Sequence, residues 1–283
     1  MKHFLVAFFV FPLLAIGGAG TRAAETQQPV TTYTFSVVPQ YAPAQLHREW
    51  FPLIDRISRE SGVKLELKIA ASIPKFEAEF AKGLPDFAYM NPYHAVMAKH
   101  EQGYLPILRD SKMLTGILLV RRDSPYQTVA DLNGKTIGFP APNAFGASLY
   151  MRALLSETFK INYETRYLNT HSNVYRHVAQ GNVAAGGGVN LTFADERPEI
   201  HEQLRVLYQT PAVAPHPVVV HPRVPRPVRE AIAKAILNLQ GDEPGREMLK
   251  EIRTSQPVRA NYEQDYYPLE MLKVQKYVVP ENE

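Results

Sequence analysis

The segment DFAYMNPYHAVMAKHEQG, residues 86–103, joins a short apolar stretch directly to a helical pattern. Residues 86–90 are typical of a strand, and Asn91 follows as a good N-cap with Pro92 at the first helical position. Gly103 is a good C-terminal stop for the same helix. The segment therefore predicts a strand that runs at once into a helix, the unit from which α/β folds are built.

The same alternation extends in both directions from this unit. Strands are predicted at residues 33–38, 63–69, 116–122, 135–139, 164–168, 183–189, 204–208 and 218–220. Helices are predicted around residues 46–62, 76–80, 144–159 and 172–180 and through the tail from 226 to about 276. Two βαβ-like halves predict an α/β fold with two lobes. In such folds ligands lie at the carboxyl ends of strands, which selects the loops 39–44, 90–94, 140–147 and 169–173.

The N-terminus has the pattern of a secretory signal peptide. Lys2 and His3 precede the apolar run FLVAFFVFPLLAI, and small residues follow, so we assign residues 1–24 to a cleaved leader. The run is too short to span a bilayer comfortably, and we expect a soluble protein in the periplasm. The chain has no cysteine, which excludes disulfides, thiolate metal sites and a cysteine nucleophile. The net charge of +3 is spread out, so no nucleic-acid partner is expected.

The stretch GFPAPNAFGASLYMRALL, residues 138–155, resembles the mouth of a binding site. We expect a helix to begin at Asn143, with Ala144, Phe145, Gly146 and Ala147 in its first turn. The first N–H groups of a helix have no internal partner, and the helix dipole adds positive charge there. Such an end binds phosphate or carboxylate without charged side chains. The alternative is an ordinary helix start capped by Asn143.

Three further side chains lie at the selected loops, and a fourth, His216, lies directly before a predicted strand. Tyr93 and His94 follow the strand at 86–90 and could face a cleft; alternatively Tyr93 packs on the sheet and His94 is solvated or locally hydrogen-bonded. His171 lies between a strand and a helix, where the alternative role is a polar residue of the first turn. His216, between two prolines, could contact a ligand or be exposed.

Enzyme motifs are absent from the sequence. Ser148 lacks the G-x-S-x-G elbow, and no H-E-x-x-H occurs. The run 186–188 (GGG) has no following Lys-Ser/Thr, so it is not a phosphate loop; we interpret it as a strand pressed against a helix. We expect no catalytic residue, no cofactor and no metal, although a metal site of His94, His171 and His216 stays open as an alternative.

Several segments together resemble one known family. They are VVPQYAPAQLHREWFPLIDRIS, GVKLELKIA, GLPDFAYMNPYHAV, LVRRDSPYQTVADLNGKTIGF, RALL, NTHSNV and TPAVAPHPVVV, between residues 37 and 220. The chain resembles the phosphate/phosphite/phosphonate-binding family of periplasmic substrate-binding proteins, which feed ABC transporters. The resemblance implies a type II periplasmic-binding-protein fold, each lobe a mostly parallel sheet flanked by helices. It implies lobe 1 at 31–122 and 213–283, lobe 2 at 123–212, and closure on a ligand between them.

The resemblance breaks at the positions that determine specificity. The family's Ser-Thr-Ser run at the lobe 2 helix start falls on Ala144, Phe145 and Gly146. Two family tyrosines fall on Ile73 and Leu114. The family's aspartate, which contacts an amine, falls on His216, and only the cleft histidine is kept, as His171. Losing several hydrogen bonds to a charged group, each worth about 1.5–3 kcal/mol, argues against tight phosphonate binding.

We therefore expect a non-enzymatic solute-binding protein that captures a small anion between its lobes and passes it to an ABC permease. Backbone N–H groups would hold the anion, His171 and His216 would donate hydrogen bonds, and aromatic residues would shape the walls. The predicted ligand-binding residues are Gln40, Tyr41, Asn91, Pro92, Tyr93, His94, Asn143, Ala144, Phe145, Gly146, Ala147, His171 and His216. Two alternatives remain: a ligand-sensing partner of a membrane sensor kinase, and metal capture by the histidines.

Overall fold

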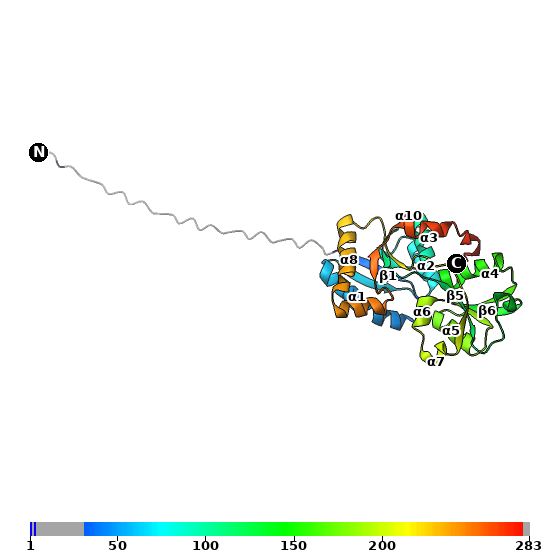
Figure 1. The fold of residues 1–283 in the computed structure, drawn as a ribbon. Helices are drawn as coiled ribbons and strands as arrows, with labels where there is room; N and C mark the ends of the chain where they lie inside the picture. Colours follow the sequence, from blue (N-terminus) through cyan, green and yellow to red (C-terminus); the bar gives the residue numbers. More distant parts are fainter. Residues whose placement is uncertain (2, 4–30, 280–283) are drawn as a thin grey trace. The chain divides into compact units, whose positions relative to one another are not determined.

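Two β-sheets organise the chain in the computed structural model, which describes residues 1, 3 and 31–279 (Figure 1). The first sheet has the strand order β11-β4-β10-β3-β1-β2 and the second has the order β7-β6-β8-β5-β9. The strands of the first sheet are β1 Thr32–Val37, β2 Lys64–Ile69, β3 Phe87–Tyr89, β4 Leu105–Asp110, β10 Pro217–Val220 and β11 Pro257–Arg259. Those of the second are β5 Gly116–Arg121, β6 Lys135–Phe139, β7 Tyr163–Tyr167, β8 Ala185–Val189 and β9 Leu204–Gln209.

Helices cover both sheets, and each sheet with its helices forms one lobe. Lobe 1 carries α1 Pro43–Ser61, α2 Ile73–Ala81, α3 Pro92–Gln102, α8 Arg226–Asn238, α9 Glu243–Glu251, α10 Tyr262–Asp265 and α11 Tyr267–Glu270. Lobe 2 carries a π-helical turn Phe145–Leu149 (η2), α4 Tyr150–Glu157, α5 His171–Ala179, α6 Asn190–Ala194 and α7 Pro198–His201. Short 3₁₀ turns lie at η1 Val129–Leu132, η3 Leu239–Gly241 and η4 Val274–Tyr277. The expected strand–helix alternation is thus confirmed, while strands β4 and β11 were not predicted.

The sheets are mixed, so the expectation of mostly parallel sheets is wrong. β1 pairs in parallel with β2 and β3, but β10 runs antiparallel between β3 and β4. In lobe 2, β6 pairs in parallel with β7 and β8, while β5 runs antiparallel between β8 and β9. The antiparallel strands β5 and β10 directly follow the two segments at which the chain changes lobes, so each enters its sheet without a crossover helix.

The strand β5 belongs to lobe 2, although we expected residues up to 122 in lobe 1. Its residues alternate between two apolar clusters: Ile117 and Leu119 pack with α5, whereas Leu118 and Val120 pack with α4. A strand that is buried on both faces has a continuous apolar sequence, and GILLV has this pattern. The chain therefore changes lobes before residue 116, at the segment 111–115.

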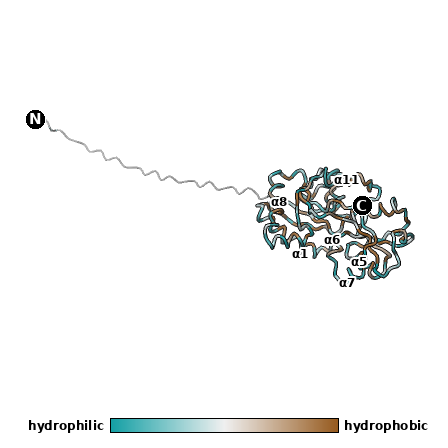
Figure 2. Tube along the Cα trace, in the orientation of Figure 1, coloured by the Kyte–Doolittle hydropathy of each residue, from teal (hydrophilic) through white to brown (hydrophobic). Residues whose placement is uncertain are grey.

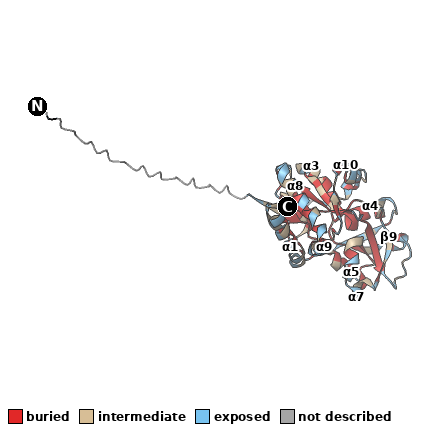
Figure 3. Cartoon of the chain, turned by 60° about the vertical axis from the view of Figure 1, so that its left-hand side comes forward, coloured by how far each residue is buried: buried red, intermediate tan, exposed pale blue. Residues whose placement is uncertain are grey.

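The two lobe-changing segments are hydrogen-bonded to each other. The N–H of Leu114 donates to the carbonyl of Val213, and the N–H of Val213 donates to that of Leu114, both at 2.9 Å. Hydrophobic segments lie mainly inside the molecule (Figure 2), and buried segments follow the strands (Figure 3). One apolar cluster runs from lobe 1 into η2 and β8, so the surface between the lobes is continuous with the core of lobe 1.

The glycine run of β8 positions the turn η2. A Cβ on Gly187 would collide with the carbonyl oxygen of Ala147, and one on Gly116 of β5 would collide with that of Gly146. The flanking glycines of the run meet α5 in the same way. The interpretation of the run as a strand pressed against a helix is confirmed, and two helical elements use it, one on each face of the sheet.

We expect Gly187→Ala to lower the free energy of unfolding by about 3 kcal/mol, because the added methyl meets a backbone oxygen that no side-chain rotation can clear. Urea denaturation measures the loss. Gly241→Ala is the matched control, since a Cβ there meets nothing within 4 Å. Equal stability of the two variants would show that η2 does not depend on this close approach.

Candidate functional site

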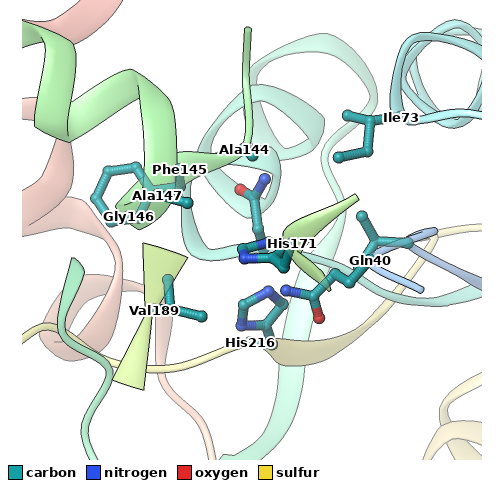
Figure 4. Close-up of a pocket in the computed structure, with 11 residues that line it drawn as sticks. Gln40, Ile73, Ala144, Phe145, Gly146, Ala147, His171, Val189 and His216 are labelled. Atoms are coloured by element: carbon teal, nitrogen blue, oxygen red, sulfur yellow. The ribbon is translucent and has the colours of Figure 1, made fainter. Parts of the chain in front are cut away.

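A small cavity lies where the strand ends of the two lobes meet (Figure 4). Its volume is about 10 Å³, close to the space that one water molecule needs. The residues that line it are Val38, Gln40, Ile73, Asn91, Ala144, Phe145, Gly146, Ala147, His171, Val189 and His216. We call this space the inner cavity. It draws on the four loops that the sequence selected. The other lining residues are Val38, Ile73 of α2, Val189 of β8 and His216.

The structure brings eight of the thirteen predicted ligand-binding residues to the inner cavity. They are Gln40, Asn91, Ala144, Phe145, Gly146, Ala147, His171 and His216. The other five, Tyr41, Pro92, Tyr93, His94 and Asn143, are buried next to it but do not line it. The sequence thus selected residues that the fold brings together at one cavity, while four of the other five side chains make contacts within the protein that no local pattern indicated.

The turn η2 supplies backbone donors to the inner cavity. The first intrahelical donors are the N–H groups of Ser148 and Leu149, which reach the carbonyl of Ala144 at 2.7 and 3.2 Å. The N–H groups of residues 145–147 precede them in the first turn and have no acceptor within the helix. The helix therefore begins at Phe145, and our expectation that it begins at Asn143 is wrong.

His171 enters the inner cavity from the start of α5. The side chain is 2% exposed, and its Nδ1 lies 3.2 Å from Oγ1 of Thr192. Thr170 caps the helix by accepting the N–H of Asn173 at 3.2 Å, which fixes the backbone that carries the imidazole. Burial lowers the pKa of His171 to about 4, so the ring is neutral at pH 7.

His216 enters from the second lobe-changing segment, directly before β10. It is 5% exposed, its ring stacks on Tyr89 at a centroid distance of 5.4 Å, and its Nε2 has no hydrogen-bond partner among the described residues. Burial, followed by the charge that His171 and His94 would carry, lowers the pKa of His216 to about 3. The His216 ring, the His171 ring and the Gln40 amide point toward one another (Figure 4).

His94 does not face the inner cavity. It is fully buried, and its Nε2 lies 2.8 Å from Oε1 of Glu77 on α2. The other carboxylate oxygen of Glu77 accepts a hydrogen bond from the Asn143 side chain at 3.0 Å. Sequence reasoning missed Glu77, and the one available signal was an acidic residue beside the apolar pair Phe76 and Phe80 in a short helix.

Asn143 joins elements of both lobes instead of capping a helix. Its Nδ2 donates to the carbonyl of Val279 at 2.9 Å, and its Oδ1 accepts the N–H of Val279 at 3.0 Å. Its backbone carbonyl accepts from Nδ2 of Asn91 at 3.1 Å, and Asn91 also caps α3 by accepting the N–H of His94 at 2.7 Å. The capping role expected for Asn91 is thus confirmed, and that expected for Asn143 is wrong.

Tyr93 and Phe145 pack against each other across the lobes. The two rings are nearly parallel with centroids 6.1 Å apart, and Tyr150 stacks on the other face of Phe145 at 5.7 Å. The Phe145 ring extends away from the two histidines (Figure 4). Phe145 therefore borders the inner cavity while its ring joins α3 to α4.

Tyr41 belongs to a second contact between the lobes. The guanidinium of Arg253 lies 4.2 Å from the centre of the Tyr41 ring. Arg253 also pairs with Glu49 of α1 at 2.6 Å and with Asp195, next to α6, at 2.5 Å. Pro92, the remaining predicted residue, is the first residue of α3.

Two searches of the described residues bear on other functions. They contain no group of three or more His, Cys, Asp or Glu side chains arranged to hold a metal ion. No helix within 31–279 has the length and apolarity needed to cross a membrane. The predicted signal peptide at 1–24 lies outside the described residues apart from residues 1 and 3.

The architecture and the sequence both match known proteins. A family model described as the periplasmic phosphonate substrate-binding protein of ABC transporters matches residues 35–266. The chain belongs to this family. The family consists of transporter substrate-binding proteins, which bind a solute and catalyse no reaction, so solute binding for ABC transport is the general function.

Solved structures of similar proteins support the fold. A binding-protein component of an ABC phosphonate transporter from Pseudomonas aeruginosa superposes with a TM-score of 0.76 at 14% identity, covering 87% of both chains. A Prochlorococcus marinus protein in complex with methylphosphonate gives 0.78 at 13% identity, covering 85% of this chain and 96% of that one. A Xanthomonas citri protein bound to a chloride ion gives 0.73 at 17% identity, covering 87% and 98%. The expected two-lobed type II fold is confirmed.

We expect Asn143→Ala to lower the free energy of unfolding by about 3 kcal/mol, because it removes three side-chain hydrogen bonds and takes a donor from the buried Glu77 carboxylate. Chemical denaturation measures the change. Asn238→Ala, at an exposed position at the end of α8, is the control and is expected to change stability by about 0.5 kcal/mol or less. If the free energy of unfolding falls by the same small amount in both variants, Asn143 does not join the lobes.

The two neutral histidines predict a specific pH dependence of stability. Their pKa values in the folded chain are about 4 and about 3, below the unfolded value of 6.5, so the unfolded chain binds more protons between these limits. The two histidines therefore cost no stability above pH 6.5. As the pH drops toward 4, the free energy of unfolding falls by up to about 1.4 kcal/mol per pH unit for each histidine. Urea denaturation at pH 7.5, 6 and 5 tests this, and His216→Asn is expected to give a shallower pH slope than the parent protein. Identical slopes would contradict the burial of a neutral ring.

Proposed function

We propose that this protein captures a small anion between its lobes, with an acceptor atom of the anion in the inner cavity, and delivers it to an ABC permease. The observation that carries the proposal is His216, which lines the inner cavity and whose Nε2 is buried without a partner among the described residues. A buried polar atom without a partner costs about 1–3 kcal/mol, and a ligand atom in the cavity would remove that cost.

The charge distribution around the inner cavity favours a negative ligand. No carboxylate belongs to its lining, and the nearby Glu77 carboxylate is directed to His94 and Asn143. The N-terminal end of η2 and α4 carries partial positive charge together with unpaired N–H donors. The imidazoles of His171 and His216 are neutral when the site is empty and can take up a proton when an anion arrives.

The sequence differences from the family determine which hydrogen-bond donors are available to the anion. Ala144, Phe145 and Gly146 stand where the resemblance expects hydroxyl side chains, so the remaining donors are backbone N–H groups, the imidazoles and the Gln40 amide. Two structural relatives are anion complexes, one with methylphosphonate and one with chloride, which supports an anionic ligand here as well. We favour uptake over sensing because the family is defined by ABC transport.

The test is a thermal-shift screen with chloride, acetate, phosphate, methanesulfonate and methylphosphonate. We expect at least one anion to raise Tm, and a ligand at 100 times its Kd stabilises by about 2.7 kcal/mol. The shift is expected to be larger at pH 5.5 than at pH 7.5, because the bound anion raises the histidine pKa values and binding takes up protons.

Two variants locate the binding site. His171→Ala and His216→Asn are each expected to raise the apparent Kd at least tenfold and so to reduce the Tm shift. The reason is that each variant loses one hydrogen bond to a charged group. His47→Ala, at an exposed histidine that stacks on Phe51, is the control and is expected to leave it unchanged. A shift that survives both site variants undiminished would exclude the inner cavity.

A further inference from the structure

A second hollow lies directly outside the inner cavity, and we call it the outer hollow. Its volume is about 240 Å³, compared with about 10 Å³ for the inner cavity. Both spaces are built from the same three loops. Gln40 and His171 line the inner cavity, and their sequence neighbours Pro39 and Thr170 line the outer hollow. Ile73 lines both spaces. The two spaces are therefore neighbouring parts of one cleft between the lobes.

The walls of the outer hollow differ chemically from those of the inner cavity. No charged residue belongs to its lining, which is rich in proline and also contains aromatic and small side chains. Its main apolar contributors are Pro39, Tyr41, Pro74, Pro140, Pro142 and Tyr167. The hydroxyls of Ser72 and Thr170 already accept backbone N–H groups as helix caps, at 3.3 and 3.2 Å. The outer hollow thus offers mainly apolar contact, and its remaining polar groups are the uncharged side chains of Tyr41, Tyr167 and Asn169.

The inner cavity is too small for a whole organic anion. At about 10 Å³ it accepts an atom of the size of one water, whereas the outer hollow has room for several carbon atoms. Ile73 stands at the junction, where the resemblance places a tyrosine, so an apolar side chain leads from one space to the other. A ligand that uses both spaces has one acidic end and an apolar remainder.

Resting on the proposed function, we propose that the solute is a monoanion with an apolar body, whose acidic end reaches the inner cavity while its body occupies the outer hollow. Ligands with a second charge at the far end are disfavoured, since no side chain of opposite charge lines the outer hollow. The outer hollow then determines the length and shape of the accepted solute, and the inner cavity determines its charge.

Isothermal titration with two homologous series tests the proposal: acetate, butyrate and hexanoate, and methylphosphonate, butylphosphonate and hexylphosphonate. We expect the affinity to rise about fourfold for each methylene that becomes buried and to level off when the outer hollow is full. Glutarate, which has a second carboxylate, is expected to bind at least tenfold more weakly than butyrate.

Two variants change residues that line the outer hollow and do not line the inner cavity. Tyr167→Ala removes a ring that is 39% exposed, and Ala42→Leu adds bulk at an exposed position in the wall. Both are expected to reduce the ratio of long-chain to short-chain affinity by about fivefold or more while leaving acetate and methylphosphonate binding unchanged. Tyr267→Ala, at a 47% exposed tyrosine outside both linings, is the control.

The outcomes separate the two proposals. If short and long anions bind equally, or the two variants leave the ratio unchanged, the outer hollow does not hold the ligand body, while anion capture stands. If no anion of either series binds, both proposals are overturned. If glutarate binds as tightly as butyrate, the assignment of an uncharged body is wrong.

Discussion

The contact on which the site depends is the approach of the turn η2 to two bare glycines, Gly116 of β5 and Gly187 of β8. Carbonyl oxygens of η2 occupy the space that side chains would fill on these strands. The residues at the start of the same turn, Ala144 to Ala147, line the inner cavity. A run of small residues in a strand thus becomes the support for a binding site that has no charged side chain of its own.

Several side chains near η2 that we predicted to bind the ligand connect the two lobes instead. Asn143 links Glu77 of lobe 1 to Val279 and so holds the loop before η2 against α2. Tyr93 and Phe145 stack across the same boundary, and Arg253 pairs with residues of both lobes farther away. These contacts leave a narrow inner cavity in which two buried neutral histidines are the principal side-chain donors. The lobes are therefore in direct contact around the inner cavity.

The sequence was sufficient to predict most of the strand–helix alternation, because caps, stops and apolar periodicity act locally. It also selected loops at strand ends that meet at the inner cavity, His171 among them, and it singled out His216 directly before a strand. The roles of Asn143 and His94 could not be predicted, because their partners Val279 and Glu77 are distant in sequence. The lobe assignment of β5 failed for the same reason: its apolar pattern shows burial on both faces but does not indicate which sheet it joins.

The most direct measurement of the central claim is a crystal structure of the protein with the anion that stabilises it most. The account predicts an acceptor atom of that anion within about 3.2 Å of Nε2 of His216 and of at least one N–H group of residues 145–147. An anion bound elsewhere, with the inner cavity occupied only by water, would contradict it.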